Sequence, residues 1–66
     1  MLQPVPHHPL RPVFERHEVC LGSLARAIGR SYQSTANYLS GRTQPPPAIE
    51  AKLQEVAAHL ERGVAL

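Results

Sequence analysis

The sequence predicts an all-α protein, a compact bundle of four short helices, and three observations lead to this prediction. Apolar residues recur three and four positions apart in four separate stretches, which is the spacing of one helix face. No stretch alternates apolar and polar residues as a half-buried strand does. The 66 residues are enough for one small domain and too few for a large enclosed active site.

The first helix is expected over residues 11–18. Before it, residues 1–9 hold three prolines and no periodicity, which predicts a flexible N-terminal arm. Leu10, Val13 and Phe14 share one helical face, and Pro12 suits the first turn, where its missing N–H costs nothing. Val19 is then expected to plug the core as the chain turns into the next helix.

The second helix is predicted over about residues 21–28. Leu24, Ala25 and Ile28 mark its apolar face, and Gly29 follows where a helix end favours a residue that tolerates positive φ. Small Ala25 lets a neighbouring helix approach closely. Ser31 is placed to cap the following helix, because its hydroxyl can accept a hydrogen bond from a backbone N–H of the first turn.

The third helix is predicted over about residues 32–40. Thr35, Ala36 and Leu39 continue an apolar stripe along it, and Gly41 closes it. Two short helices hinged at one glycine form a helix-turn-helix, whose second helix can enter the major groove of DNA.

The fourth helix begins at Pro46 or Pro47, because the proline run at residues 45–47 forbids a continuous helix. Its apolar stripe is the strongest amphipathic signal in the chain: Ile49, Leu53, Val56, Ala57 and Leu60. Gly63 is expected to end it. The expected organisation is therefore an arm at residues 1–9, a helix-turn-helix domain at 10–62 and a tail at 63–66.

The chain carries a net charge of only +2, but its charges are unevenly distributed. All the acidic residues lie outside the stretch 19–49, which holds Arg26, Arg30 and Arg42. A basic segment between acidic flanks favours one face directed at phosphates. The alternative is that these arginines only solvate exposed helix surface.

The pattern Leu24-Ala25, Ile28-Gly29 and Ser31, followed by residues 39–42 (Leu-Ser-Gly-Arg), resembles the helix-turn-helix of Cro-like and lambda-repressor-like phage regulators. The resemblance covers about residues 10–60. It implies that the third helix contacts bases from its first residues and again one turn later, and that the protein binds pseudo-palindromic sites as a dimer. Thr35 and Tyr38 stand where family members carry aliphatic residues; threonine still packs, and tyrosine can bury its ring.

The outward face of the third helix supplies the candidate DNA base-reading residues. Gln33 and Asn37 are four positions apart, so they share a face, and each carries the paired donor and acceptor that can engage adenine N6 and N7. Tyr32 and Ser34 are their neighbours. The alternative is that these polar side chains are only solvated.

Phosphate contacts are expected from the flanks of that helix. Ser31 and the helix N-terminus offer hydroxyl and N–H donors. Arg42 and Thr43 follow the helix where the family often grips the DNA backbone, and Arg26 and Arg30 can assist. Lys52 is interpreted as an ordinary solvated residue.

Other chemistry is not indicated. Cys20 is the only cysteine; it is expected to lie buried or half-buried at the junction of the first two helices, without a base nearby to make it a nucleophile. The four histidines, at positions 7, 8, 17 and 59, lack the spaced companions of a metal site and are interpreted as surface residues. We expect no enzyme activity, cofactor, metal or small-molecule substrate.

The location is expected to be cytoplasmic. A lone cysteine fits a reducing compartment, no apolar run is long enough to span a bilayer, and no signal peptide is visible.

The sequence therefore predicts a protein that binds double-stranded DNA sequence-specifically, a transcriptional regulator of phage or prophage type. A weak homodimer is expected through the fourth helix and the tail residues 64–66, completed on DNA, although a monomer in free solution stays open. The alternative function is a helical protein-interaction module, antitoxin-like or adaptor, that keeps the fold without reading DNA.

Overall fold

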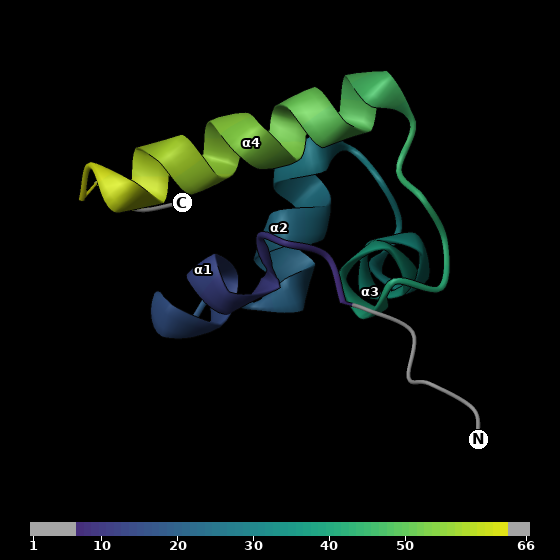
Figure 1. Cartoon of the computed structure of the whole chain (residues 1–66), viewed down its shortest axis with the longest axis horizontal. Helices are drawn as coiled ribbons and strands as arrows, with labels where there is room; N and C mark the ends of the chain where they lie inside the picture. Colours follow the sequence, from purple (N-terminus) through teal and green to yellow (C-terminus); the bar gives the residue numbers. More distant parts are fainter. Residues whose placement is uncertain (1–6, 64–66) are drawn as a thin grey trace.

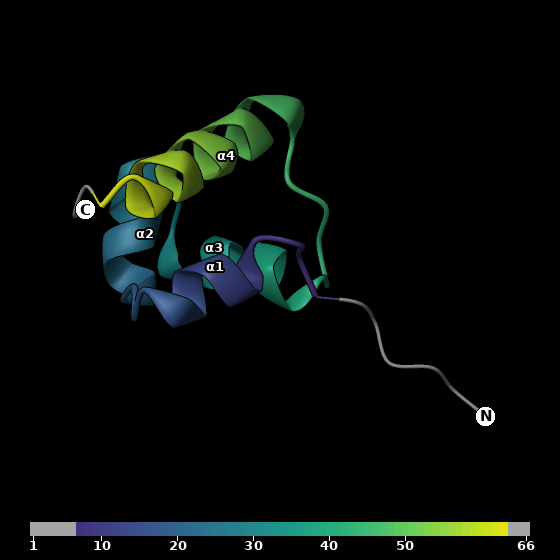
Figure 2. The same ribbon diagram turned by 60° about the vertical axis from the view of Figure 1, so that its left-hand side comes forward.

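The computed structural model of the chain describes residues 7–63, and all the regular secondary structure in that range is helical. The four helices are α1 (Arg11–Arg16), α2 (Leu21–Ile28), α3 (Tyr32–Ser40) and α4 (Pro47–Glu61). The long α4 lies across one end of α2, and α1 and α3 both lie below α4 (Figures 1 and 2). The predicted all-α globule of four helices is confirmed, and none of the described helices has the length and apolar character to cross a membrane.

All four helices contribute to one hydrophobic core. Its buried members are Phe14 of α1, Leu24 and Ile28 of α2, Tyr38 and Leu39 of α3, and Ile49, Leu53, Ala57 and Leu60 of α4. Thr35 is completely buried among them, and its hydroxyl donates to the backbone carbonyl of Ser31 at 2.9 Å. That internal bond satisfies the hydroxyl, so threonine packs where an aliphatic residue would otherwise lie.

The junction between α2 and α3 has the backbone geometry that the sequence predicts. Gly29 has a φ of 71°, in the left-handed region, and the Arg30 N–H donates to the Ala25 carbonyl at 3.0 Å. Ser31 is extended, and its hydroxyl oxygen accepts from the Ser34 N–H at 3.1 Å. α2 and α3 therefore end and begin at the predicted residues.

α1 is shorter than predicted, because it ends at Arg16 and not at residue 18. Glu18 adopts a φ of 54°, so the chain leaves the helix there. The Val19 N–H donates back to the Phe14 carbonyl at 2.9 Å, which satisfies an otherwise open helix-end acceptor. Val19 is half-buried against the core, as expected.

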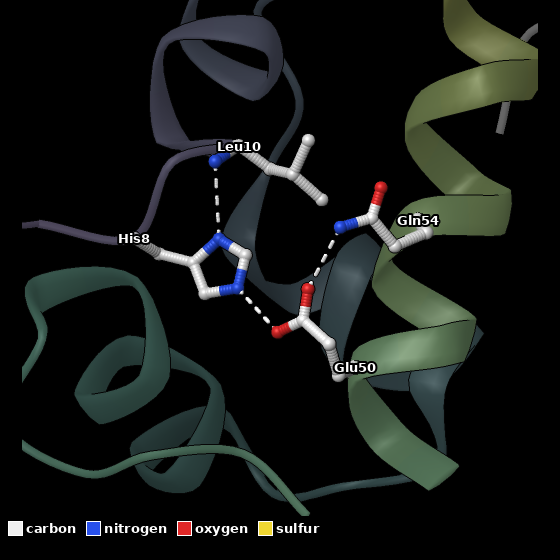
Figure 3. A network of polar contacts seen from close by, with 4 residues as sticks. All are labelled: His8, Leu10, Glu50 and Gln54. Atoms are coloured by element: carbon white, nitrogen blue, oxygen red, sulfur yellow. Dashed lines mark hydrogen bonds and ion pairs between the residues drawn. The ribbon is translucent and has the colours of Figure 1, made fainter. Parts of the chain in front are cut away.

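His8 corrects the prediction of four surface histidines, since only 8% of it is exposed. Its backbone N–H donates to the Leu39 carbonyl at the end of α3 (3.1 Å), and its Nδ1 accepts from the Leu10 N–H (3.0 Å). Its Nε2 lies 2.7 Å from Oε1 of Glu50 in α4, and Gln54 donates to the second oxygen of that carboxylate (Figure 3). His8 is buried because it contacts the start of α1, the end of α3 and Glu50 of α4 at the same time. His7, His17 and His59 are exposed.

The remainder of the predicted arm, residues 1–6, and the tail residues 64–66 lie outside the described part of the chain. Gly63 follows the last turn of α4 with a φ of 83°, where the end of that helix was expected. Along α4 the predicted stripe faces the core: Ile49, Leu53, Ala57 and Leu60 are buried and Val56 is half-buried.

Candidate nucleic-acid interface

α3 presents two contrasting faces. Thr35, Tyr38 and Leu39 are buried against the bundle. On the opposite side, Gln33 is exposed. Tyr32, the first residue of the helix, is 62% exposed, the largest exposure of any bulky apolar side chain in residues 7–63. A polar helix face with an aromatic residue at its start is therefore open to a partner.

The other two predicted base-reading residues are less exposed than Tyr32 and Gln33. Ser34 and Asn37 are both half-buried, and the Gln33 amide nitrogen donates to Asn37 Oδ1 at 3.3 Å. The structure thus brings the two predicted amides together. It places Gln33 further out than Asn37.

Ser31 uses its hydroxyl within the protein. The oxygen accepts from the Ser34 N–H, and the hydroxyl donates to Ser34 Oγ at 3.0 Å. Ser31 therefore caps α3. Its hydroxyl can donate to a phosphate only if its hydrogen bond to Ser34 Oγ breaks.

Beyond α3, the backbone N–H groups of Arg42 and Thr43 both donate to the Asn37 carbonyl, at 3.1 and 3.3 Å. Their side chains are exposed. This turn fixes the backbone after α3 and leaves the guanidinium and hydroxyl groups to contact a partner.

The arginines of residues 7–63 differ in whether they have an acidic partner. Arg11 and Arg16, on α1, each form an ion pair with a glutamate of the chain. Arg26, Arg30 and Arg42 are exposed, and no acidic side chain of residues 7–63 lies within ion-pair distance of them. Arg30 and Arg42 therefore place unpaired positive charges just before and just after α3, Arg26 adds one on α2, and Arg62 at the end of α4 is also exposed and without an ion-pair partner in residues 7–63.

Lys52 has a position that the sequence did not predict. Its ammonium lies near the junction of α2 and α3. A methyl group added to Gly29 would be 3.8 Å from Lys52 Nζ. A cation near the C-terminal end of α2 complements the helix dipole. The neighbourhood arises from α4 packing across α2, so no local sequence pattern could have indicated it.

Cys20 is exposed, which corrects the prediction of a buried or half-buried thiol. Its extended backbone, the residue before α2, turns the side chain outward, while Val19 and Leu21 on either side pack against the core. The backbone N–H groups of Ser23 and, next, Gly22 stabilise the thiolate and lower the pKa of Cys20. A helix N-terminus is the setting that usually makes a thiol reactive.

Glu50 is the other group whose ionisation is displaced. The hydrogen bond from His8, with a smaller contribution from Gln54, holds the pKa of Glu50 below its usual range. No three His, Cys, Asp or Glu side chains of residues 7–63 come together as a metal ion would require. Glu50 and His8 thus form a structural contact, whereas Arg30 and Arg42, on either side of α3, have no ion-pair partner in residues 7–63.

Comparison of the chain with protein-family models, with curated proteins and with solved structures finds no match.

Proposed function

We propose that this protein binds double-stranded DNA sequence-specifically, placing α3 in the major groove, and that it is a transcriptional regulator of phage or prophage type. In this proposal α2, the turn at Gly29 and α3 act as a helix-turn-helix. The base-reading residues are Tyr32, Gln33, Ser34 and Asn37. The phosphate-binding residues are Arg26, Arg30, Ser31, Arg42 and Thr43.

The observation that carries this proposal is that Arg30 and Arg42, on either side of α3, are unpaired, as is Arg26 on α2. Arg26, Arg30 and Arg42 are exposed and have no acidic partner in residues 7–63, whereas the arginines of α1 are neutralised. Charges without internal partners are suited to phosphates, which supply most of the affinity of DNA-binding proteins.

The dimensions of α3 support the same proposal. Its nine residues make it about 14 Å long, and Arg30 and Arg42 flank its two ends. The major groove is about 12 Å wide, with a phosphate backbone along each side. A helix is about 10–12 Å across with its side chains, so α3 can lie along such a groove, with Arg30 before it and Arg42 after it available to phosphates.

The proposed homodimer has less of the described surface available to it than the sequence indicated. The stripe of α4 faces the core, so the apolar contact expected between subunits falls on residues 64–66, outside the described part. A second subunit would double the base contacts on a two-fold symmetric site. A regulator of this kind acts in the cytoplasm and needs no cofactor.

The test is retention of duplexes from a randomised pool, followed by anisotropy measurements on the retained sequence across a salt series. We expect the logarithm of the affinity to fall against the logarithm of salt concentration with a slope of about 0.9 per phosphate contact. Arg42→Ala should reduce that slope by about one on every sequence. Arg62→Ala is the matched control, since it removes the same charge at the end of α4 remote from α3 (Figure 1).

A flat salt response, or equal effects of the two arginine substitutions, would contradict DNA binding through this face. That outcome favours the alternative, a helical protein-interaction module.

A further inference from the structure

We infer that Gln33 and Asn37 recognise one adenine as a unit, with Gln33 contacting the base and Asn37 holding the Gln33 amide in the orientation that selects adenine. This inference rests on the proposed DNA binding, names the base that the site selects, and gives Asn37 a supporting role in place of a base contact of its own. Its starting point is the contact between Gln33 Nε2 and Asn37 Oδ1 at 3.3 Å.

The chemistry of a primary amide allows both contacts at once. The nitrogen of Gln33 carries two hydrogens, and its oxygen is a separate acceptor. The hydrogen on the same side as the oxygen can donate to adenine N7 while the oxygen accepts from adenine N6. The hydrogen on the other side remains for Asn37. The internal bond therefore leaves intact the edge of the amide that pairs with adenine.

Asn37 is better placed to support than to read. It is half-buried, whereas Gln33 is exposed. Its backbone carbonyl accepts from Ser40 Oγ at 3.1 Å and from the N–H groups of Arg42 and Thr43 at 3.1 and 3.3 Å. Together with the Gly41 N–H, these donors hold the backbone at Asn37 in place, and a fixed neighbour is what a preorganised recognition side chain needs.

The direction of the hydrogen bond from Gln33 to Asn37 determines which base Gln33 prefers. Guanine presents two acceptors, N7 and O6, so Gln33 would have to turn its nitrogen toward guanine O6. Its oxygen would then face Asn37 Oδ1, so guanine requires both amides to turn over, whereas adenine fits the arrangement already present. Asn37 therefore favours adenine over guanine at one base pair.

The experiment measures the ratio of affinities for adenine and guanine at each position of the retained duplex. Gln33→Ala should abolish the ratio at one base pair, a loss of about 5- to 150-fold. Asn37→Ala should lower the ratio at that same pair by about 2- to 10-fold, the worth of one hydrogen bond. In the Gln33→Ala background it should have no further effect. Gln54→Ala, an exposed amide on α4, is the control and should leave the ratio unchanged.

Asn37→Asp separates support from reading. An aspartate keeps the acceptor for Gln33, so the ratio at that pair should persist while affinity for every duplex falls through repulsion of phosphates. If Asn37 reads its own base, the aspartate should instead create a preference for cytosine at a different base pair, because Asp accepts from cytosine N4. That result would overturn the inference.

A merely structural role of Asn37 is recognisable, because it would weaken all duplexes equally without changing the ratio, and it too would overturn the inference. If the wild type selects a sequence but the two residues act at separate pairs, the inference fails and DNA binding stands. If no duplex is bound in a salt-dependent way, both fail.

Discussion

Replacing His8 with alanine tests how the segment before α1 is held in the fold. The His8 side chain is buried, and its two ring nitrogens contact different elements: Nδ1 accepts from the Leu10 N–H and Nε2 lies against Glu50. Because Nδ1 is an acceptor, the ring proton resides on Nε2, which donates to the carboxylate. The His8→Ala substitution removes both bonds and the packed ring.

The expected loss follows from these contacts. A hydrogen bond contributes about 1 kcal/mol net, and one to a charged group about 1.5–3 kcal/mol. Losing the Leu10 and Glu50 bonds therefore costs about 2–4 kcal/mol. In a domain of this size that corresponds to a fall in melting temperature of about 10–30 °C, and the total stability is itself only about 3–10 kcal/mol. The variant should therefore unfold at a clearly lower temperature and urea concentration than the wild type.

The assay is thermal and urea denaturation followed by circular dichroism, with His59→Ala as the control. His59 is an exposed histidine on α4, so its loss should change the free energy of unfolding by less than about 0.5 kcal/mol. A double-mutant cycle with Glu50→Gln should give a coupling free energy of about 1–2 kcal/mol. Equal, small effects of the two histidine substitutions, with no coupling to Glu50, would refute the reasoning.

Three further predictions concern stability and thiol reactivity. Because the pKa of Glu50 is lowered in the folded state, the ionised carboxylate stabilises the fold above the ordinary pKa of 4.5, and this stabilisation is lost as the pH falls through the lowered pKa. In urea titrations the difference in unfolding free energy between wild type and Glu50→Gln should shrink below that pH. A difference that stays constant would contradict this. Gly29→Ala should destabilise the protein by about 1–2 kcal/mol, because φ is positive at Gly29. Gly22→Ala should stabilise it by about 0.5–1 kcal/mol, because Gly22 lies within α2 and the new Cβ would have only the Cys20 sulfur nearby, at 3.8 Å. Melting curves that rank the two variants the other way would show that the turn is misassigned. Cys20 should be alkylated by iodoacetamide in the folded protein at neutral pH faster than a free cysteine peptide, as monitored by mass spectrometry, because its thiolate fraction is raised; protection until unfolding would contradict its exposure.

The elements around the turn were predictable because their signals are local. Gly29 and Gly41 both adopt left-handed φ values, and Ser31 caps the helix that follows it. Each of these residues acts on a helix end within a few positions of itself, so α2 and α3 have the bounds that their sequence predicts. The outward placement of Gln33 follows from the same periodicity.

The residues that were mispredicted have two kinds of cause: contacts with distant elements for His8, and local backbone conformation without a sequence signal for Glu18 and Cys20. The partners of His8 lie in α3 and α4, and no spacing within residues 1–9 indicates them. Glu18 ends α1 in a conformation usually left to glycine, so its sequence gave no stop signal. Cys20 points outward because its two neighbours both turn to the core. The Gln33–Asn37 contact was predictable as a shared face, but the direction of its hydrogen bond was not.

The wide separation in sequence of the His8 contacts has a consequence for the folding pathway. His8 and Glu50 are 42 positions apart, whereas α2 and α3 meet across a short turn. Closing a long loop costs more entropy than closing a short one, so the α2–α3 pair should form in the folding transition state and the His8 contacts after it. In stopped-flow measurements His8→Ala should then accelerate unfolding and leave the refolding rate nearly unchanged. The contacts of His8 would therefore mainly slow unfolding and lengthen the lifetime of the native state.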